Sequence, residues 1–288
     1  KGELEEAVLH HTDELQEGPE LAMLRQTPGV RLNRFEPLQW MADVDRELHL
    51  GARLQELYQR VQNPVARSNI LRAAVLHLQG GVYLDLDTVT VQSLRPLLSS
   101  RQFLGRERIV WPYFVRRSRS LKLKLKSQVL NGIRATLRRA PGGYRWFQSV
   151  SHLYYCGVNG AILGAESGAP LMAGYLRAMV AQPEAAQLAK HGLGTHLLQQ
   201  EVERYSGQDL TIHEPEVFYP LAPEISEHWF RATNRPNLDQ VLYPETRIVH
   251  WYASGRAKLV IPEITPEYVR RHADRQLYSA LARPLLDG

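Results

Sequence analysis

The chain has 288 residues, of which 44% are hydrophobic and 23% are charged. These proportions are typical of a globular protein with a sizeable core, and they exclude a disordered chain. Lys and Arg outnumber Asp and Glu by 35 to 30, and the net charge of +5 favours anionic partners such as nucleotide diphosphates, nucleic acid or acidic lipids without selecting one.

Cys156 is the only cysteine, so an internal disulfide and a zinc site built from several cysteines are both excluded. No apolar run approaches the roughly 20 residues that a membrane-spanning helix needs. We therefore expect a cytoplasmic protein. A secreted effector stays open as the alternative, because residues upstream of Lys1 could target or complete the domain.

Short strands and helices alternate in the first part of the chain. The pattern predicts strands at Ala7–His10 and Val30–Phe35, with a helix at Pro19–Gln26 between them. A longer helical pattern over Leu38–Arg60 is interrupted at Gly51.

The clearest helix start in the chain is Asn63, which suits an N-cap and is followed by Pro64 in the first turn. The predicted helix runs to about Gln79, where two glycines end it, and Val82–Leu86 follows as a buried strand. Strands that alternate with helices in this way predict an α/β fold with a mixed or parallel sheet.

The segment 108–165 contains no acidic residue and eleven Lys or Arg. Within it, Leu121, Leu123 and Leu125 alternate with lysines, a period that predicts a strand. Leu130, Ile133 and Leu137 then fall at helical spacing. The segment is interpreted either as a solvated basic face or as a surface that docks an anionic acceptor or a membrane interface, which would place the protein at the membrane periphery.

The second half resumes the α/β alternation. It predicts helices at Pro170–Val180 and His196–Tyr205, and strands at Gly160–Leu163, Leu210–His213 and Arg247–Trp251.

The residues that point to chemistry are Asp85-Leu86-Asp87, at the end of the strand 82–86. Side chains at i and i+2 of a strand point to the same side, so two carboxylates are expected to converge at one strand end. Like charges so placed repel unless a cation lies between them, and carboxylate oxygens suit a divalent ion. Such an ion could bridge diphosphate oxygens.

The stretch from Ser68 to Arg72, followed by a helix and then by Gly80–Asp87, resembles the DXD-containing glycosyltransferase sugar-binding family. That family includes yeast-type initiating mannosyltransferases and α-1,4-galactosyltransferases, and it is distantly similar to clostridial glucosylating toxin catalytic domains. The resemblance implies a GT-A fold, a Rossmann-like mixed sheet flanked by helices with additional helical segments. It also implies a nucleotide-sugar donor, a Mn²⁺ or Mg²⁺ ion, and retention at the anomeric carbon.

By this resemblance, Asp87 would bind the metal directly, and Asp85 would bind it through water or hold the ribose. Arg72 would meet the donor sugar or its diphosphate, and a guanidinium fork suits phosphate. Ser68 and Asn69 would join Arg72 in donor binding. The family has Asp where this chain has Asn69, whose amide can still bond a sugar hydroxyl.

Three later positions also resemble family sites. Asn159 precedes a strand at which the family brings an Asn to the donor sugar. His250 and Ser254 resemble the C-terminal segment that closes the site, where His250 would be a third metal ligand and Ser254 a donor contact. The implied organisation is one domain over 1–288, with a donor-binding core at about 20–165 and an acceptor-binding, closing part at about 166–288.

The function expected from the resemblance is a metal-dependent retaining transfer from a UDP- or GDP-sugar, UDP favoured, to a saccharide, glycolipid or protein hydroxyl. A bacterial cell-surface enzyme and an effector both fit. One alternative is a haloacid-dehalogenase-like phosphatase with Asp85 as nucleophile, although no Asp-Asp or Gly-Asp-x-x-x-Asp follows. Another is a non-enzymatic basic module for nucleic acid or membrane, which leaves the paired aspartates unexplained. We expect no nucleic-acid partner.

Overall fold

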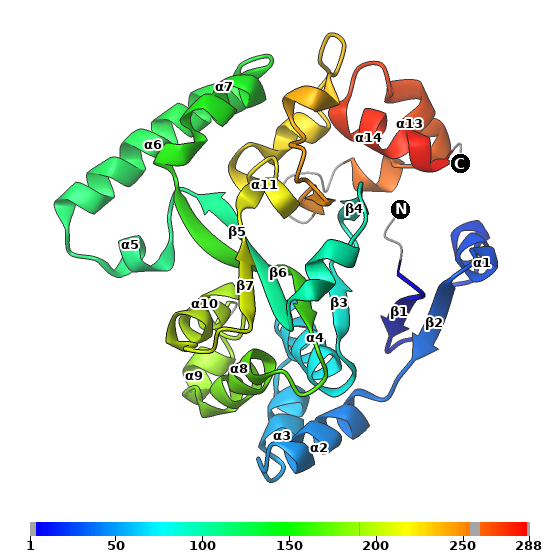
Figure 1. The fold of residues 1–288 in the computed structure, drawn as a ribbon, viewed down its shortest axis with the longest axis vertical. Coiled ribbons are helices and arrows are strands. Elements are labelled where there is room, and N and C mark those ends of the chain that lie inside the picture. The colour runs from blue at the N-terminus through cyan, green and yellow to red at the C-terminus, as the bar shows by residue number, and fades with distance from the viewer. Residues whose placement is uncertain (1–3, 190, 254–259, 287–288) are drawn as a thin grey trace. The chain divides into compact units, whose positions relative to one another are not determined.

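The computed structural model describes residues 4–189, 191–253 and 260–286. Strands and helices alternate along the chain (Figure 1), which confirms the predicted α/β class. The chain forms two compact units: unit 1 comprises Lys1–Tyr83, Ser93–Phe103 and Gly164–Leu210, and unit 2 comprises Leu84–Gln92, Leu104–Leu163 and Thr211–Gly288. No helix in the described ranges is long and apolar enough to cross a membrane. The prediction of one domain over 1–288 stays a prediction.

The largest sheet has four strands in the order β3–β6–β5–β7 (Figure 1). The bounds of these strands are β3 Gly81–Leu84, β5 Gln102–Ile109, β6 Tyr155–Ala165 and β7 Leu210–His213. The strands predicted at Gly160–Leu163 and Leu210–His213 lie within β6 and β7, the strand predicted at Val82–Leu86 overlaps β3, and β5 was not predicted.

Unit 1 also contains a two-stranded parallel sheet, in which Ala7 pairs with Val30. Its strands and helices are β1 Ala7–His11, α1 Pro19–Gln26, β2 Val30–Arg34, α2 Pro37–Glu47, α3 Arg53–Arg60, α4 Pro64–Gln79, η1 Arg95–Ser99, α8 Pro170–Ala181, α9 Glu184–Gln187 and α10 Thr195–Arg204. The strands and helices predicted for this part of the chain are confirmed to within about three residues at their ends, with the break at Gly51 separating α2 from α3.

Helix α4 begins and ends as its sequence predicts. The side chain of Asn63 accepts hydrogen bonds from the N–H groups of Val65 and Ala66, at 2.9 and 3.4 Å. At the other end Gly80 has a φ of 71°, and a Cβ there would lie 2.7 Å from the backbone nitrogen of Ser167. Gly80, which connects α4 to β3, is therefore required both by its positive φ and by the close approach of the Ser167 backbone.

Unit 2 holds a short antiparallel pair, in which Thr88 of β4 faces His250 of β8. The strands and helices of this unit are β4 Thr88–Thr90, α5 Tyr113–Arg117, α6 Leu121–Arg139, α7 Gly143–Val150, η2 Ser151–Leu153, α11 Pro215–Phe218, η3 Pro223–Trp229, η4 Leu238–Gln240, β8 Ile248–His250, η5 Ile261–Glu263, α13 Pro266–His272 and α14 Leu277–Leu286. Large side chains such as Trp229, Tyr144 and Phe147 form its buried core.

The strand predicted from Leu121, Leu123 and Leu125 is wrong, because these residues form the first turns of the 19-residue helix α6. Ser120 caps this helix by accepting a hydrogen bond from the N–H of Leu123, at 3.4 Å. The alternation of leucine and lysine spans only six residues, whereas leucine and lysine both have high helix propensity and the cap fixes the start.

Candidate metal centre

The two aspartates lie in a turn between β3 and β4, and not on a strand. The predicted strand 82–86 is therefore two residues too long, since β3 ends at Leu84. Leu86 at the tip of the turn is 87% exposed, so its apolar character does not mark a buried strand position. The same-face rule for strands does not explain how Asp85 and Asp87 meet, and the turn itself must bring them together.

Backbone hydrogen bonds hold this turn within unit 2. The N–H of Asp85 donates to the C=O of Ala161 in β6 at 2.8 Å, and the Asp85 C=O accepts from the Thr88 hydroxyl at 2.8 Å. On the other side of the turn, the C=O of Asp87 accepts from the N–H of Trp251 at 3.0 Å. The turn is thus bound both to β6 and to the segment that follows β8.

His250 comes to the turn from a point 163 residues further along the chain. It is the last residue of β8, and its Nε2 lies 3.0 Å from Oδ1 of Asp87. One possible ligand atom from each of Asp85, Asp87 and His250 lies within 4.8 Å of the others. The three residues that the resemblance nominates as metal ligands therefore converge on one place.

A backbone turn after His250 completes the partners of Asp87. Tyr252 has a φ of 58°, a left-handed conformation that is uncommon for a bulky residue. The chain then directs the N–H of Ala253 to Oδ2 of Asp87, at 2.7 Å. Each oxygen of the Asp87 carboxylate therefore has a partner, and the strained residue lies beside the site, where such strain is often found.

The balance of these contacts keeps Asp87 ionised. Burial raises the pKa of the Asp87 carboxyl. The hydrogen bond and charge of His250, together with the N–H of Ala253, more than offset that rise, so the pKa lies below its ordinary value. Asp87 is therefore a negatively charged oxygen ligand at neutral pH.

A second carboxylate, Glu107 of β5, lies in the same unit and was missed from the sequence. Its Oε2 accepts hydrogen bonds from Asn159 Nδ2 at 2.7 Å and from the Tyr252 hydroxyl at 2.9 Å. Burial raises the pKa of Glu107, and these hydrogen bonds and the charge of His250 offset that rise only in part. The one signal in the sequence is that Glu107 is the last acid before the acid-free segment 108–165.

The ring of His250 is enclosed by aromatic side chains. Ring centroids of Tyr252 and Tyr219 lie 4.1 and 5.8 Å from that of His250. Its Nδ1 is buried and has no hydrogen-bond partner among the residues that the structure describes. The Nε2 atom of His250 and the carboxylates of Asp85 and Asp87 together form a suitable ligand set for a divalent cation that accepts both oxygen and nitrogen.

The predicted donor-binding residues Ser68, Asn69 and Arg72 all lie on α4, in unit 1. Arg72 donates to the hydroxyl of Ser68 at 3.3 Å, and its guanidinium stacks on the ring of Tyr83, 4.6 Å from the centroid. Nδ2 of Asn69 lies 3.2 Å from the position that a Cβ on Gly194 would take, so a side chain there would crowd it. These residues form a cluster of their own.

The remaining predicted donor contacts have different outcomes. Asn159 is held at both ends of its side-chain amide, because its Oδ1 accepts from the N–H of Ala161 at 2.7 Å while its Nδ2 donates to Glu107. Its approach to a donor sugar stays a prediction. Ser254 lies outside the described residues.

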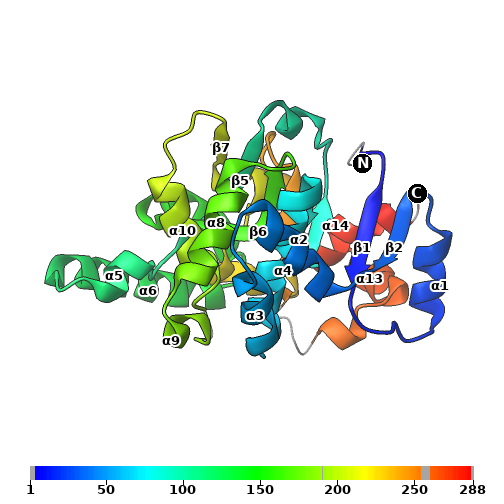
Figure 2. The same cartoon turned by 90° about the horizontal axis from the view of Figure 1, so that it is seen from below.

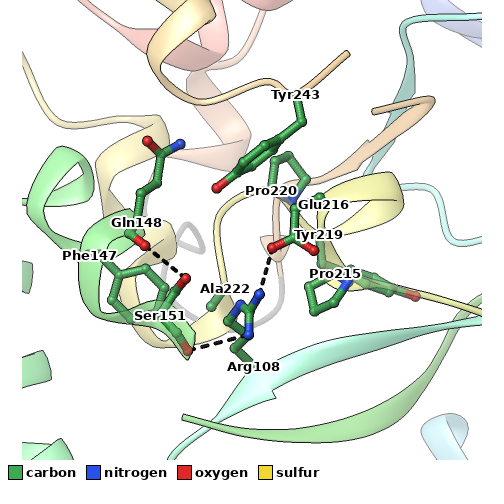
Figure 3. A pocket seen from close by; sticks show the side chains of 10 residues that line it. All are labelled: Arg108, Phe147, Gln148, Ser151, Pro215, Glu216, Tyr219, Pro220, Ala222 and Tyr243. Carbon is green, nitrogen blue, oxygen red and sulfur yellow. Dashed lines mark hydrogen bonds and ion pairs between the residues drawn. The ribbon is translucent and has the colours of Figure 1, made fainter. Parts of the chain in front are cut away.

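Unit 2 also has a small pocket beside the ion pair of Arg108 and Glu216, whose closest atoms are 2.6 Å apart (Figure 3). The lining residues are Arg108, Phe147, Gln148, Ser151, Pro215, Glu216, Tyr219, Pro220, Ala222 and Tyr243. The pocket has room for about one water molecule, so we assign no ligand to it.

No curated protein matches the chain. Among solved structures, the chain is similar to the ligand-free glycosyltransferase domain from the YGT toxin, with 11% identity and a TM-score of 0.35 over 91% of this chain and 73% of that one. Residues 23–104 match the family model described as the glycosyltransferase sugar-binding region containing DXD motif. This part of the chain, which includes Asp85 and Asp87, is therefore similar to a DXD-containing glycosyltransferase sugar-binding region, the family that the sequence motif resembles.

Proposed function

We propose that this protein is a metal-dependent retaining glycosyltransferase that uses a nucleotide-sugar donor. One observation supports the proposal most strongly: the acids of the DXD motif, Asp85 and Asp87, converge with His250 so that their ligand atoms lie within 4.8 Å. Neither a structural turn nor a buried core histidine requires this combination. Two carboxylates and an imidazole that converge in this way form a ligand set that suits a divalent cation.

In this proposal Asp85, Asp87 and His250 hold Mn²⁺ or Mg²⁺. The bound ion would neutralise charge on the diphosphate of the leaving nucleotide. Glu107 acts as a positioning residue, since one of its oxygens holds both Asn159 and Tyr252 in place. Tyr252 in turn packs on His250, and the backbone beside it bonds Asp87.

The donor-binding role belongs to Arg72, Ser68 and Asn69. Arg72 is a planar cation held by Tyr83 and Ser68, and such a fork suits diphosphate oxygens or sugar hydroxyls. Asn69 would bond a sugar hydroxyl. We favour a UDP-sugar as donor, with the hydroxyl of a saccharide, glycolipid or protein as acceptor. Retention at the anomeric carbon requires no strong general base from the chain, because the acceptor attacks the face that the nucleotide leaves.

The test is a thermal-shift and hydrolysis screen of UDP- and GDP-sugars with and without Mn²⁺. We expect one donor to raise the melting temperature only when the metal is present, by mass action on the folded state. Asp85→Asn and His250→Gln should lower metal-dependent donor hydrolysis at least about 100-fold, since loss of a ligand exceeds the effect of losing its supporting contacts.

The matched control is Asp239→Asn, which removes the charge of an exposed acid in the same unit. It should retain wild-type hydrolysis. Melting curves without metal show whether each variant folds, so that loss of activity is not mistaken for loss of structure. If folded Asp85→Asn and Asp87→Asn both turn over donor at the wild-type rate with Mn²⁺, the assignment is wrong.

A further inference from the structure

The first half of α6 presents apolar side chains to solvent. Leu121, Leu125 and Val129 follow one another at intervals of four residues, which places them on one face of the helix. They are 81%, 63% and 56% exposed. The opposite face is the buried one, with Ser127 and Leu130. An apolar stripe that the fold does not cover marks an interaction site.

Exposed cations surround this stripe. Within α6, Lys122 and Lys126 flank it on one side and Lys124 on the other. Helix α5 lies beside α6 (Figure 2) and adds Arg116 and Arg117, while Arg119 lies in the connection between the two helices. None of these six cations forms an ion pair with a residue in the described ranges. Folding does not account for their charge.

The second half of the same helix differs. There, Arg134 pairs with Glu224 at 2.5 Å and Arg138 pairs with Glu227 at 3.2 Å, both acids coming from η3. The structure thus anchors one half of α6 through its charges and leaves the charges of the other half to solvent. A purely solvated helix face would carry polar residues where Leu121, Leu125 and Val129 lie.

We propose that the first half of α6, together with α5, docks on an anionic lipid bilayer. The leucines and Val129 would enter the boundary between headgroups and acyl chains, and the lysines would reach lipid phosphates with their stems along the apolar surface. The three side chains of the stripe are aliphatic and offer no ring for base stacking, so the stripe itself fits acyl chains better than single-stranded nucleic acid. A second copy of this face would be repelled by its own charge. The proposal does not depend on the transferase assignment.

The experiment is co-sedimentation of the full chain with vesicles of equal parts phosphatidylglycerol and phosphatidylcholine, against vesicles of phosphatidylcholine alone. We expect binding to the anionic vesicles only, and weaker binding as salt rises. Each cation near an anionic surface favours binding by about fivefold. The triple variant Lys122→Gln, Lys124→Gln, Lys126→Gln should therefore bind at least tenfold more weakly, and the triple Lys→Arg variant should bind as wild type.

The apolar stripe is tested separately by Leu121→Ser with Leu125→Ser, which leaves every charge in place. This variant should also lose about tenfold or more in binding, because two buried side chains leave the lipid phase. The matched control is Met23→Ser with Leu188→Ser, which removes two exposed apolar side chains of unit 1 and should bind as wild type. Circular dichroism checks that each variant is folded.

Three results would overturn the proposal. The wild type could bind neutral and anionic vesicles equally, it could bind neither, or the serine variant could retain its vesicle binding in full. If the wild type then binds single-stranded nucleic acid more tightly than anionic vesicles, the surface is a nucleic-acid site. Donor hydrolysis in solution should be unchanged in all of these variants, so failure here leaves the transferase assignment standing.

Discussion

The acidic turn at Asp85–Asp87 and the basic first half of α6 are both densely charged, but the fold treats their charges in opposite ways. At the turn, each oxygen of the Asp87 carboxylate has a hydrogen-bond partner: His250 for one, and the N–H of Ala253 for the other. In the first half of α6, Lys122 and Lys124 extend into solvent without an ion pair among the described residues.

The difference shows which charges are part of the folded structure. A mostly buried, paired carboxylate such as Asp87 fixes geometry, and removing either partner leaves an uncompensated group that costs about 1–3 kcal/mol. An exposed, unpaired lysine contributes little to folding, so its position is set by what the surface meets. The turn is therefore expected to respond to mutation through stability as well as binding, and the basic half of α6 through binding alone.

Asp87→Ala is expected to have the largest effect on stability. It removes the acceptor of two hydrogen bonds and leaves His250 beside an empty space, and we expect a loss of about 3 kcal/mol in the free energy of unfolding. Urea denaturation without metal measures it. The control Asp239→Ala, an exposed acid of the same unit, should change stability by at most about 0.5 kcal/mol. If Asp87→Ala lowered the free energy of unfolding by no more than the Asp239→Ala control does, the contacts of Asp87 would not stabilise the turn.

Much of the turn could be predicted from the sequence, but for a partly wrong reason. The strand pattern placed Asp85 and Asp87 on one strand face, whereas a turn with an exposed Leu86 brings them together. The resemblance supplied His250 as the third residue. Glu107 could not be found, because its partners Asn159 and Tyr252 lie 52 and 145 residues away, and no local pattern encodes such a contact.

For the basic helix α6, the sequence showed the charge correctly but not the local structure of the charged part. Its composition was evident from the sequence, and the helical spacing of Leu130, Ile133 and Leu137 is confirmed by α6. The secondary structure of its first turns was misjudged, since a six-residue alternation of leucine and lysine has the period of a strand. In the structure Ser120 caps a helix by accepting a hydrogen bond from the N–H of Leu123, and that helix, α6, continues for 19 residues. Only the helical geometry shows that Leu121 and Leu125 share a face while Leu123 lies elsewhere.

The second half of α6 is also held by His228 of η3, and we expect this contact to make the free energy of unfolding depend on pH. Nε2 of His228 bonds the C=O of Leu137 at 3.0 Å. Burial lowers the pKa of His228 below its ordinary value of 6.5, and the hydrogen bond to Leu137 offsets only part of this. The unfolded chain therefore takes up the proton more readily than the folded one. The contribution of His228 to stability is full above about pH 6.5 and is lost as the pH falls through the lowered value.

His228→Gln should accordingly reduce the slope of unfolding free energy against pH below about 6.5, while lowering stability above it. Urea titrations at a series of pH values measure the slope. His152→Gln, at an exposed histidine of the same unit, should retain the wild-type slope. An unchanged slope in His228→Gln would mean that His228 takes up its proton equally in both states.

The smallest effect on stability is expected for the triple variant Lys122→Gln, Lys124→Gln, Lys126→Gln. Glutamine and lysine have similar helix propensities, and Lys122 and Lys124 have no partner to lose. Lys126 loses only its contact with the ring of Tyr155, 4.5 Å away and worth about 0.5–1 kcal/mol at an exposed site. Removing three like charges from adjacent turns relieves repulsion of similar size. The net change in unfolding free energy should therefore stay within about 0.5 kcal/mol. A loss above 2 kcal/mol would show that these lysines hold the fold together, and the contrast with the acidic turn would then disappear.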